Sequence, residues 1–118
     1  MICYDLRFPV WTRNTNNYDV LIFMANWPKP RISAWDTLLK ARAIENMCYT
    51  IGVNRVGTDG NKLEYVGHTQ TIDMLGKVIS NAIDEKEMII EATLNKKELI
   101  TTRNKFQFLN DSDSFEIK

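Results

Sequence analysis

The chain has 118 residues, of which 44% are hydrophobic and 25% are charged, a composition typical of one globular domain with a modest core. Fifteen Lys and Arg residues balance fifteen Asp and Glu residues, so the charge gives no reason to expect nucleic acid or an anionic membrane as a partner. A net charge of zero favours self-association instead, and we expect a homo-oligomer. The longest apolar run, Val20–Ala25, is far too short to span a bilayer.

The first predicted feature is a strand end followed by a turn. Apolar residues precede Cys3, and charged and turn-forming residues follow it at once, so we expect a strand to carry Cys3 to the edge of a sheet before the backbone turns at Tyr4 and Asp5. A helix beginning just beyond would direct N–H groups and a positive dipole end at the thiol, which favours the thiolate. From these flanks alone, a small buried hydrophobic residue is the simpler interpretation of Cys3.

A polar loop and a buried strand come next. Residues 12–17 are rich in Asn and Thr and are predicted to form a surface loop after a short helix. Val20–Ala25 contains six apolar residues without alternation, which indicates a strand covered on both faces. Pro28 and Pro30 then end any regular element.

The longest helix is predicted to begin at Ser33, which forms a capping-box pattern with Asp36. Lys40 and Arg42 fall off its apolar face, and Arg42 with Glu45 is most simply a pair on the helix surface. The apolar face is predicted to contain Trp35, Leu38, Leu39, Ala43 and Met47.

The remaining elements alternate between strands and turns before a last helix. The patterns predict a strand at 49–53, a turn at 57–61, a hairpin at 69–80 around Leu75 and Gly76, a strand at 88–94 and a helix at 96–103. Residues 110–116 are acidic and polar, and we expect them to be extended. Because strands and helices interleave, the fold class is α/β.

Five segments of this chain together resemble the nitrilase, or carbon-nitrogen hydrolase, superfamily. They are Cys3-Tyr4-Asp5-Leu6-Arg7-Phe8-Pro9, Ala25-Asn26-Trp27-Pro28, Ala41-Arg42-Ala43-Ile44-Glu45-Asn46, Gly52-Val53-Asn54-Arg55-Val56-Gly57 and Tyr65-Val66-Gly67-His68. The resemblance is specific because the segments occur in the order and spacing of the family and cover essentially the whole chain. The residues after Pro9 suit the omega-amidase branch, whose members hydrolyse the side-chain amide of small 2-oxo acid amides.

The resemblance implies a Glu-Lys-Cys triad in which Cys3 is the nucleophile. Its thiolate attacks the amide, ammonia leaves, and water hydrolyses the thioester. The backbone N–H of Tyr4 is expected to face the oxyanion. The Glu and the Lys of the family lie upstream of the cysteine segment, where this chain has only Met1 and Ile2. Residues 1–118 are therefore expected to form a partial domain, the C-terminal half of a four-layer α-β-β-α sandwich, and to be inactive alone.

Other polar and aromatic residues have weaker claims to the site. Asn26 and Trp27 follow a buried strand, where ligands of α/β sheets bind, so we expect them beside the substrate, with a purely structural Trp27 as the alternative. Asp5 and Arg7 are expected to form a salt bridge or to fix the turn. His68 is the only histidine, but the resemblance places it outside the triad, in packing or in support of the site.

No metal, phosphate-binding or cofactor motif is present. Cys3, Cys48 and His68 lack the short spacing of a zinc site, and no glycine-rich nucleotide motif occurs. Cys48 is expected to be buried. No secretory pattern precedes Cys3, so a cytoplasmic location is expected. Two interpretations remain open: an amidase acting on a small-molecule amide, or a truncated domain that serves only in assembly or binding. The resemblance implies that the tail, residues 110–116, can lie across a neighbouring subunit.

Overall fold

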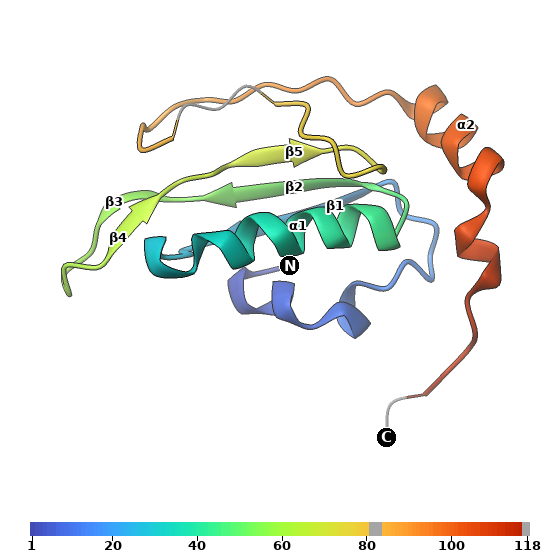
Figure 1. The fold of residues 1–118 in the computed structure, drawn as a ribbon, viewed down its shortest axis with the longest axis horizontal. Coiled ribbons are helices and arrows are strands. Elements are labelled where there is room, and N and C mark those ends of the chain that lie inside the picture. Colours follow the sequence, from blue (N-terminus) through green and yellow to red (C-terminus); the bar gives the residue numbers. More distant parts are fainter. Residues whose placement is uncertain (81–83, 117–118) are drawn as a thin grey trace.

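The computed structural model describes residues 1–80 and 84–116, in which a long helix lies against a three-stranded sheet (Figure 1). The sheet has the order β1-β2-β5. Strand β1 (Val20–Ala25) pairs in parallel with β2 (Tyr49–Asn54), and β2 pairs antiparallel with β5 (Gln70–Ile72). Two adjacent parallel strands need a crossover connection, and α1 (Ile32–Glu45) supplies it.

Two hairpins follow β2. Strand β3 (Val56–Thr58) pairs with β4 (Glu64–Val66), and the side chain of Asp59 holds the turn between them by accepting backbone hydrogen bonds from Asn61 and Leu63. The turn predicted at 57–61 therefore lies slightly later, because Thr58 still pairs with Glu64. The hairpin predicted at 69–80 is confirmed by β5 and a bridge between Ile72 and Val78.

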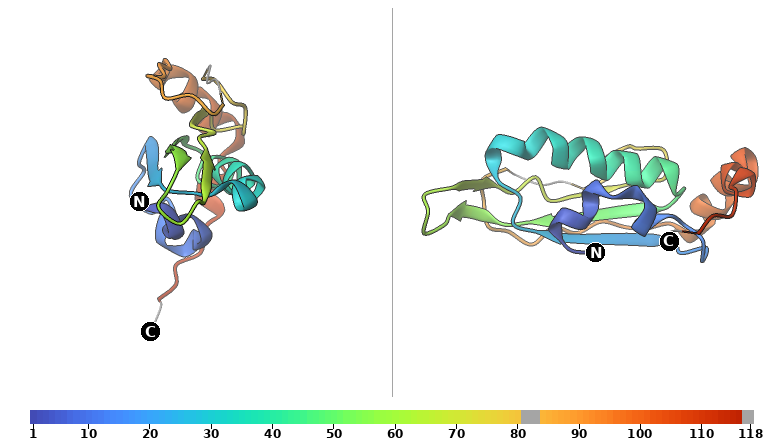
Figure 2. Two further views of the ribbon diagram at one scale, coloured as in Figure 1. Left: turned by 90° about the vertical axis from the view of Figure 1, so that its left-hand side faces the viewer. Right: turned by 90° about the horizontal axis from the view of Figure 1, so that it is seen from below.

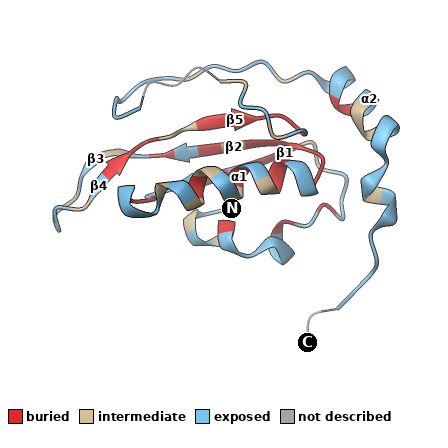
Figure 3. Ribbon diagram, viewed as in Figure 1, coloured by how far each residue is buried: buried red, intermediate tan, exposed pale blue. Residues whose placement is uncertain are grey.

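The core lies between α1 and the sheet, as the burial colours of Figure 3 show. Its fully buried side chains include Trp35, Leu39 and Ala43 of α1 and Phe23 of β1. Figure 2 shows α1 lying along one face of the sheet. The predicted apolar face of the helix is thus largely correct, although Leu38 is only partly buried and Met47 lies beyond the helix end.

The opposite face of β1 is exposed, so the prediction of a strand covered on both faces is wrong. Leu21 and Phe23 are buried under α1, whereas 48% of Ile22 and 57% of Met24 are exposed. The reason is that α1 covers only one face of the sheet. The second face of this apolar strand has no comparable layer over it within residues 1–80 and 84–116.

The helix begins one residue before the predicted start, and no capping box forms at Ser33. Lys29–Arg31 form a 3-10 turn after Pro28 that leads directly into α1, so Arg31 is the N-cap and provides no side-chain cap. Ser33 already lies within the first helical turn. Arg42, predicted to lie off the buried face, is 3% exposed, which is a second correction.

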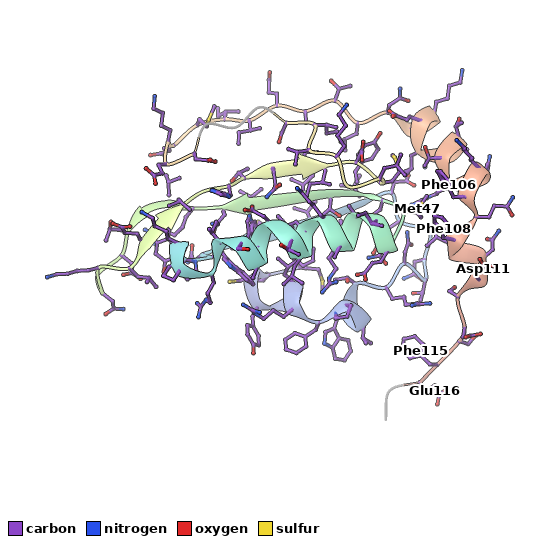
Figure 4. All side chains as sticks on the ribbon, in the orientation of Figure 1. Met47, Phe106, Phe108, Asp111, Phe115 and Glu116 are labelled. Carbon is purple, nitrogen blue, oxygen red and sulfur yellow. The ribbon has the colours of Figure 1, made fainter. Side chains whose placement is uncertain are left out.

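The C-terminal part crosses the end of the sheet and then turns away (Figure 1). The strand predicted at 88–94 is not formed: these residues have no strand assignment, and strands need hydrogen-bonded partners to be stable. The predicted final helix is confirmed as α2 (Lys96–Phe106), which extends beyond Arg103 and is capped by the Asn95 side chain. A 3-10 turn (Phe108–Asp111) and an exposed tail follow, and Figure 4 shows Phe106, Phe108 and Phe115 spaced along this segment.

Candidate active site

Cys3 leaves the sheet beside the end of β1. Ile2 forms a parallel bridge with Met24, and the Met24 N–H donates to the Met1 carbonyl at 3.2 Å. Cys3 then opens a five-residue 3-10 turn, η1 (Cys3–Arg7). A single β-bridge therefore stands in place of the predicted strand end, and the predicted helix is a single short turn. The Cys3 backbone has φ +43°, a left-handed conformation that a non-glycine residue adopts only where its surroundings fix it.

The side chain of Asp5 fixes this turn. One of its carboxylate oxygens accepts a hydrogen bond from the Ile2 N–H at 2.9 Å, and the Asp5 N–H donates to the Ile2 carbonyl at 3.0 Å. Asp5 therefore fixes the turn, which is one of the two roles predicted for it. Arg7 and Asp5 form no ion pair within the part of the chain that the structure describes; the Arg7 guanidinium lies 5.0 Å from the centre of the Trp27 ring.

Asn26 lies next to Cys3, and Trp27 lies in the core. The Cys3 thiol is 4.0 Å from the Asn26 carbonyl oxygen, at the long limit of an S–H hydrogen bond. Trp27 is 3% exposed, and its indole N–H donates to the Arg31 carbonyl at 2.6 Å. The ring packs against Trp35 with centroids 5.6 Å apart. The structure therefore brings the Asn26 backbone to Cys3 and gives the Trp27 ring a packing role.

Sequence reasoning missed Asn54, which holds the Trp27 backbone. The Trp27 N–H donates to the Asn54 side-chain oxygen at 2.7 Å, and the Asn54 amide group donates to the carbonyls of Trp27 and Gly67. Asn54 is buried at the end of β2, opposite Ala25 in the parallel register. Asn54 lies within the Gly52–Gly57 segment that resembles the family, and this was the one sequence signal for its importance. No pattern of residue types indicated that its side chain would hold Trp27.

His68 is held by carboxylates, which agrees with packing, one of the two roles predicted for it. Its Nδ1 lies 2.9 Å from the Asp36 carboxylate, and its Nε2 lies 3.7 Å from Asp84. Gln70 donates to Asp36 at 2.7 Å, and the Trp35 indole donates to the His68 carbonyl at 2.9 Å. These contacts tie β5 to α1.

Cys48 is buried and differs from Cys3 in its surroundings. Cys48 is 0% exposed, whereas Cys3 is half-buried, so the predicted burial of Cys48 is confirmed. Burial raises the pKa of the Cys48 thiol to about 11. At neutral pH Cys48 is therefore protonated and a poor nucleophile.

Two grooves lie away from Cys3. One of about 420 Å³ is lined by Pro9, Val10 and Phe115, among other residues, and one of about 550 Å³ is lined by Ile51, Val53 and neighbouring side chains; Cys3 lines neither. Neither a metal site nor a membrane span is found among the residues that the structure describes. Within residues 1–80 and 84–116, no cluster of three His, Cys, Asp or Glu side chains could hold a metal ion. None of the helices described is long and apolar enough to cross a membrane.

Known proteins similar to this chain include bacterial amidases. The omega-amidase YafV of Escherichia coli K12 is 46% identical over 117 residues, which cover 99% of this chain and 46% of that protein. The 2-oxoglutaramate amidase of Bacillus subtilis is 37% identical over 113 residues, which cover 94% of this chain and 43% of that protein. The chain thus spans about half the length of these relatives.

A solved structure agrees with the fold. XC1258 from Xanthomonas campestris, a CN-hydrolase superfamily protein crystallised with an arsenic adduct in its active site, superposes with a TM-score of 0.93 at 43% sequence identity. The match covers 100% of this chain and 47% of that one. The α/β fold is therefore that of a partial nitrilase-type domain. The family model for carbon-nitrogen hydrolases matches residues 1–104, and the chain belongs to the carbon-nitrogen hydrolase family of the nitrilase superfamily.

Proposed function

We propose that Cys3 is the nucleophile of an amidase that hydrolyses the side-chain amide of a small 2-oxo acid amide. The observation that carries this proposal is the mounting of Cys3: a β-bridge from Ile2 to β1 places a half-buried thiol in a left-handed backbone conformation next to Asn26. The relatives named omega-amidase and 2-oxoglutaramate amidase support the choice of substrate class.

In the proposed reaction the Cys3 thiolate attacks the amide carbonyl carbon and forms a tetrahedral oxyanion. The backbone N–H of Tyr4 stabilises this oxyanion, and the Tyr4 ring, which is exposed and packs edge-on against Phe8, takes no part. The C–N bond then breaks, ammonia leaves with an added proton, and a thioester remains. Water cleaves the thioester, which yields the carboxylic acid and regenerates the thiol.

Residues 1–118 form, in this proposal, the C-terminal half of a four-layer α-β-β-α sandwich. The upstream half would supply the Glu as general acid and base and the Lys as the second oxyanion donor. The exposed apolar face of β1 supports this arrangement, because a second sheet could cover it. Asn26 lies beside the substrate, and Trp27 supports the wall of the site from the core.

The alternative is a non-catalytic domain that only binds or assembles, and the exposed apolar residues Ile22 and Met24 are the observation that favours it. A mixing experiment separates the two functions. The chain is incubated with 2-oxoglutaramate or succinamate, alone and with a separately produced N-terminal half of the Escherichia coli omega-amidase, and ammonia release is followed.

We expect no measurable activity from the chain alone. General acid-base catalysis raises the rate of such a reaction roughly a hundred- to ten-thousand-fold, and one oxyanion donor raises it about a hundred- to a thousand-fold. In this proposal the upstream half supplies both groups, so the chain alone lacks both contributions. Activity should appear on mixing, should be lost with Cys3→Ala, and should survive the control Cys48→Ala. Complex formation without ammonia release would favour the non-catalytic alternative. Activity of the chain alone that Cys3→Ala abolishes would contradict the assignment of acid-base catalysis to an upstream half.

A further inference from the structure

We infer that Arg42 of α1 is a positioning residue for Cys3, through a hydrogen bond to the turn that carries the nucleophile. The inference rests on the proposed function of Cys3 and deepens it. It assigns a role to the Ala41–Asn46 segment, which contributes no group to the proposed chemistry.

Arg42 connects the last turn of α1 to η1. Its Nη2 donates to the Leu6 carbonyl at 2.6 Å, and its Nη1 donates to the Glu45 carboxylate at 2.8 Å. The Arg42 side chain is 4% exposed, whereas that of Glu45 is 41% exposed. Glu45 thus orients the guanidinium from the surface, and the buried end of the fork holds the backbone of the turn three residues after Cys3.

Packing alone does not account for a buried arginine at this position. A buried charge carries a desolvation cost, and an apolar side chain of similar volume often stabilises a core at least as well. What an apolar side chain cannot provide is a charge-assisted hydrogen bond, which is short, directional and stronger than a neutral one. The geometry of Arg42 therefore indicates a requirement to fix Leu6 in place.

Cys3 needs such a restraint because its backbone conformation is unfavourable. A non-glycine residue at φ +43° persists only when the surrounding structure determines it. Within the turn, two backbone hydrogen bonds contribute, from the Asp5 N–H to the Ile2 carbonyl and from the Phe8 N–H to the Asp5 carbonyl. Arg42 adds a bond from outside the turn, so its loss should let the turn relax.

A second contact of α1, to Asn14 beyond η1, provides a matched control. Asn46, the C-cap of α1, accepts a hydrogen bond from the Asn14 N–H at 2.9 Å, and the Asn14 side chain donates to the Asn46 carbonyl at 3.0 Å. Asn46 is buried like Arg42. The Asn46 side-chain amide also donates to the Arg42 backbone carbonyl at 3.0 Å, a bond that closes the end of α1 and does not involve the guanidinium. Asn46 holds the segment beyond η1, so its loss should weaken the fold while the bond from Arg42 to Leu6, and with it the turn at Cys3, persists.

The test compares the 118-residue chain with Arg42→Met, Arg42→Lys and Asn46→Ala. Hydrogen exchange of the Asp5 and Phe8 amides reports the order of the turn. The rate of Cys3 alkylation by iodoacetamide, followed by mass spectrometry, reports whether the thiol keeps its position and reactivity. The rate of Cys48 alkylation reports unfolding.

We expect Arg42→Met to lower the protection of the Asp5 and Phe8 amides and the rate of Cys3 alkylation by roughly tenfold each, with Cys48 still protected. Arg42→Lys should keep part of the amide protection and part of the Cys3 alkylation rate, because the lysine ammonium group can still donate to the Leu6 carbonyl. Asn46→Ala should leave both at the values of the unmodified chain.

The inference is overturned if Arg42→Met changes neither quantity, or if Arg42→Met and Asn46→Ala change them equally. Should Arg42→Met expose Cys48 through unfolding, the same comparison is made with Arg42→Lys. Failure of the proposed function has a different signature: Cys3 of the unmodified chain would react no faster than the cysteine of an unstructured peptide. The amide protection would still test the role of Arg42 in that case.

Discussion

Gly52 lies under α1 at a point where the helix leaves no room for a side chain. A Cβ atom there would lie 2.3 Å from Leu39 Cδ1 and 2.7 Å from Trp35 Cζ2. Because both neighbours are fully buried core residues, we expect Gly52→Ala to reduce the free energy of unfolding by about 1–3 kcal/mol. Urea denaturation measures this, with Gly60→Ala as the control, since no heavy atom lies within 4 Å of the added Cβ. Equal stability of the two variants would disprove the close contact.

The thiol of Cys48 should make the protein less stable in alkali. Burial raises its pKa from 9.0 to about 11, so the folded state binds more protons than the unfolded state between these values. Its contribution to the free energy of unfolding is therefore complete below pH 9 and is lost as the pH rises toward 11, by up to about 3 kcal/mol. Denaturation at several pH values should show a shallower decline for Cys48→Ala. Parallel declines for the two proteins would contradict the pKa shift.

Single residues differ in how well sequence reveals them. The burial of Cys48 could be predicted from its place between a helix and a strand. The resemblance indicated a packing or supporting role for His68, but not its partners Asp36 and Asp84. Arg42 could not: helical periodicity gives a charged residue an outward position, and its buried acceptor belongs to Leu6, which lies 36 residues away in sequence. Asn54 was missed for the same reason, since its partners at Trp27 and Gly67 come together only in the fold.

At the scale of elements, local patterns predicted most of the strands and helices. Strands β1 and β2, the hairpin after β5 and helix α2 all follow from apolar runs and turn residues. The start of α1 was displaced by the 3-10 turn that Pro28 introduces, a geometric effect with no signal in the capping pattern. The apolar run at 88–94 could not form a strand by itself, because a strand depends on a partner that its own sequence does not specify.

Helix α2 is attached by its buried Leu99 and by Arg103, which binds the residues just before β1 and β2. Its guanidinium donates to the carbonyls of Met47 at 2.8 Å and Tyr18 at 2.6 Å, and to the Asp19 carboxylate at 3.0 Å. We expect Arg103→Met to cost about 1–3 kcal/mol and to reduce amide protection within α2 while α1 stays protected. Hydrogen exchange resolved by residue measures this. The exposed Lys97→Met is the control, and a loss of protection shared equally by both helices would contradict a local attachment.

The molecule as a whole is a flat slab with one apolar face uncovered. Its extents are 46 × 38 × 18 Å, and the short dimension holds one helix layer on one sheet (Figure 2). The parallel register pairs Ile22 with Ile51 and Met24 with Val53 on the face away from α1. The α/β class was evident from the sequence, and the resemblance to half of a four-layer sandwich also implied an uncovered apolar sheet face. The local pattern of β1 did not reveal it, because the unbroken apolar run indicated burial on both sides.

We therefore predict that the chain forms dimers or larger species in solution. Ile22, Met24 and Val53 are all more than 40% exposed, and uncovered apolar surface recruits partners. Strand β1 is the outermost strand of its sheet, and of the residues described only residues 1–2 pair with its outer edge. Light scattering over a range of concentrations measures the mass. Met24→Lys should lower it, whereas Thr58→Lys, on the separate β3–β4 hairpin, should not. A monomer at high concentration with cooperative melting would show that the face needs no partner.

The central claim is that the fold positions Cys3 as a nucleophile, and alkylation of the unmodified chain under native conditions tests it most directly. Iodoacetamide is added at neutral pH, and the rates at Cys3 and Cys48 are compared with the rate for an unstructured cysteine peptide. We predict that Cys3 reacts at least about tenfold faster than Cys48, that it also reacts faster than the peptide, and that both differences disappear in denaturant. Equal native labelling of Cys3 and Cys48, or a Cys3 rate no higher than that of the peptide, would contradict the account.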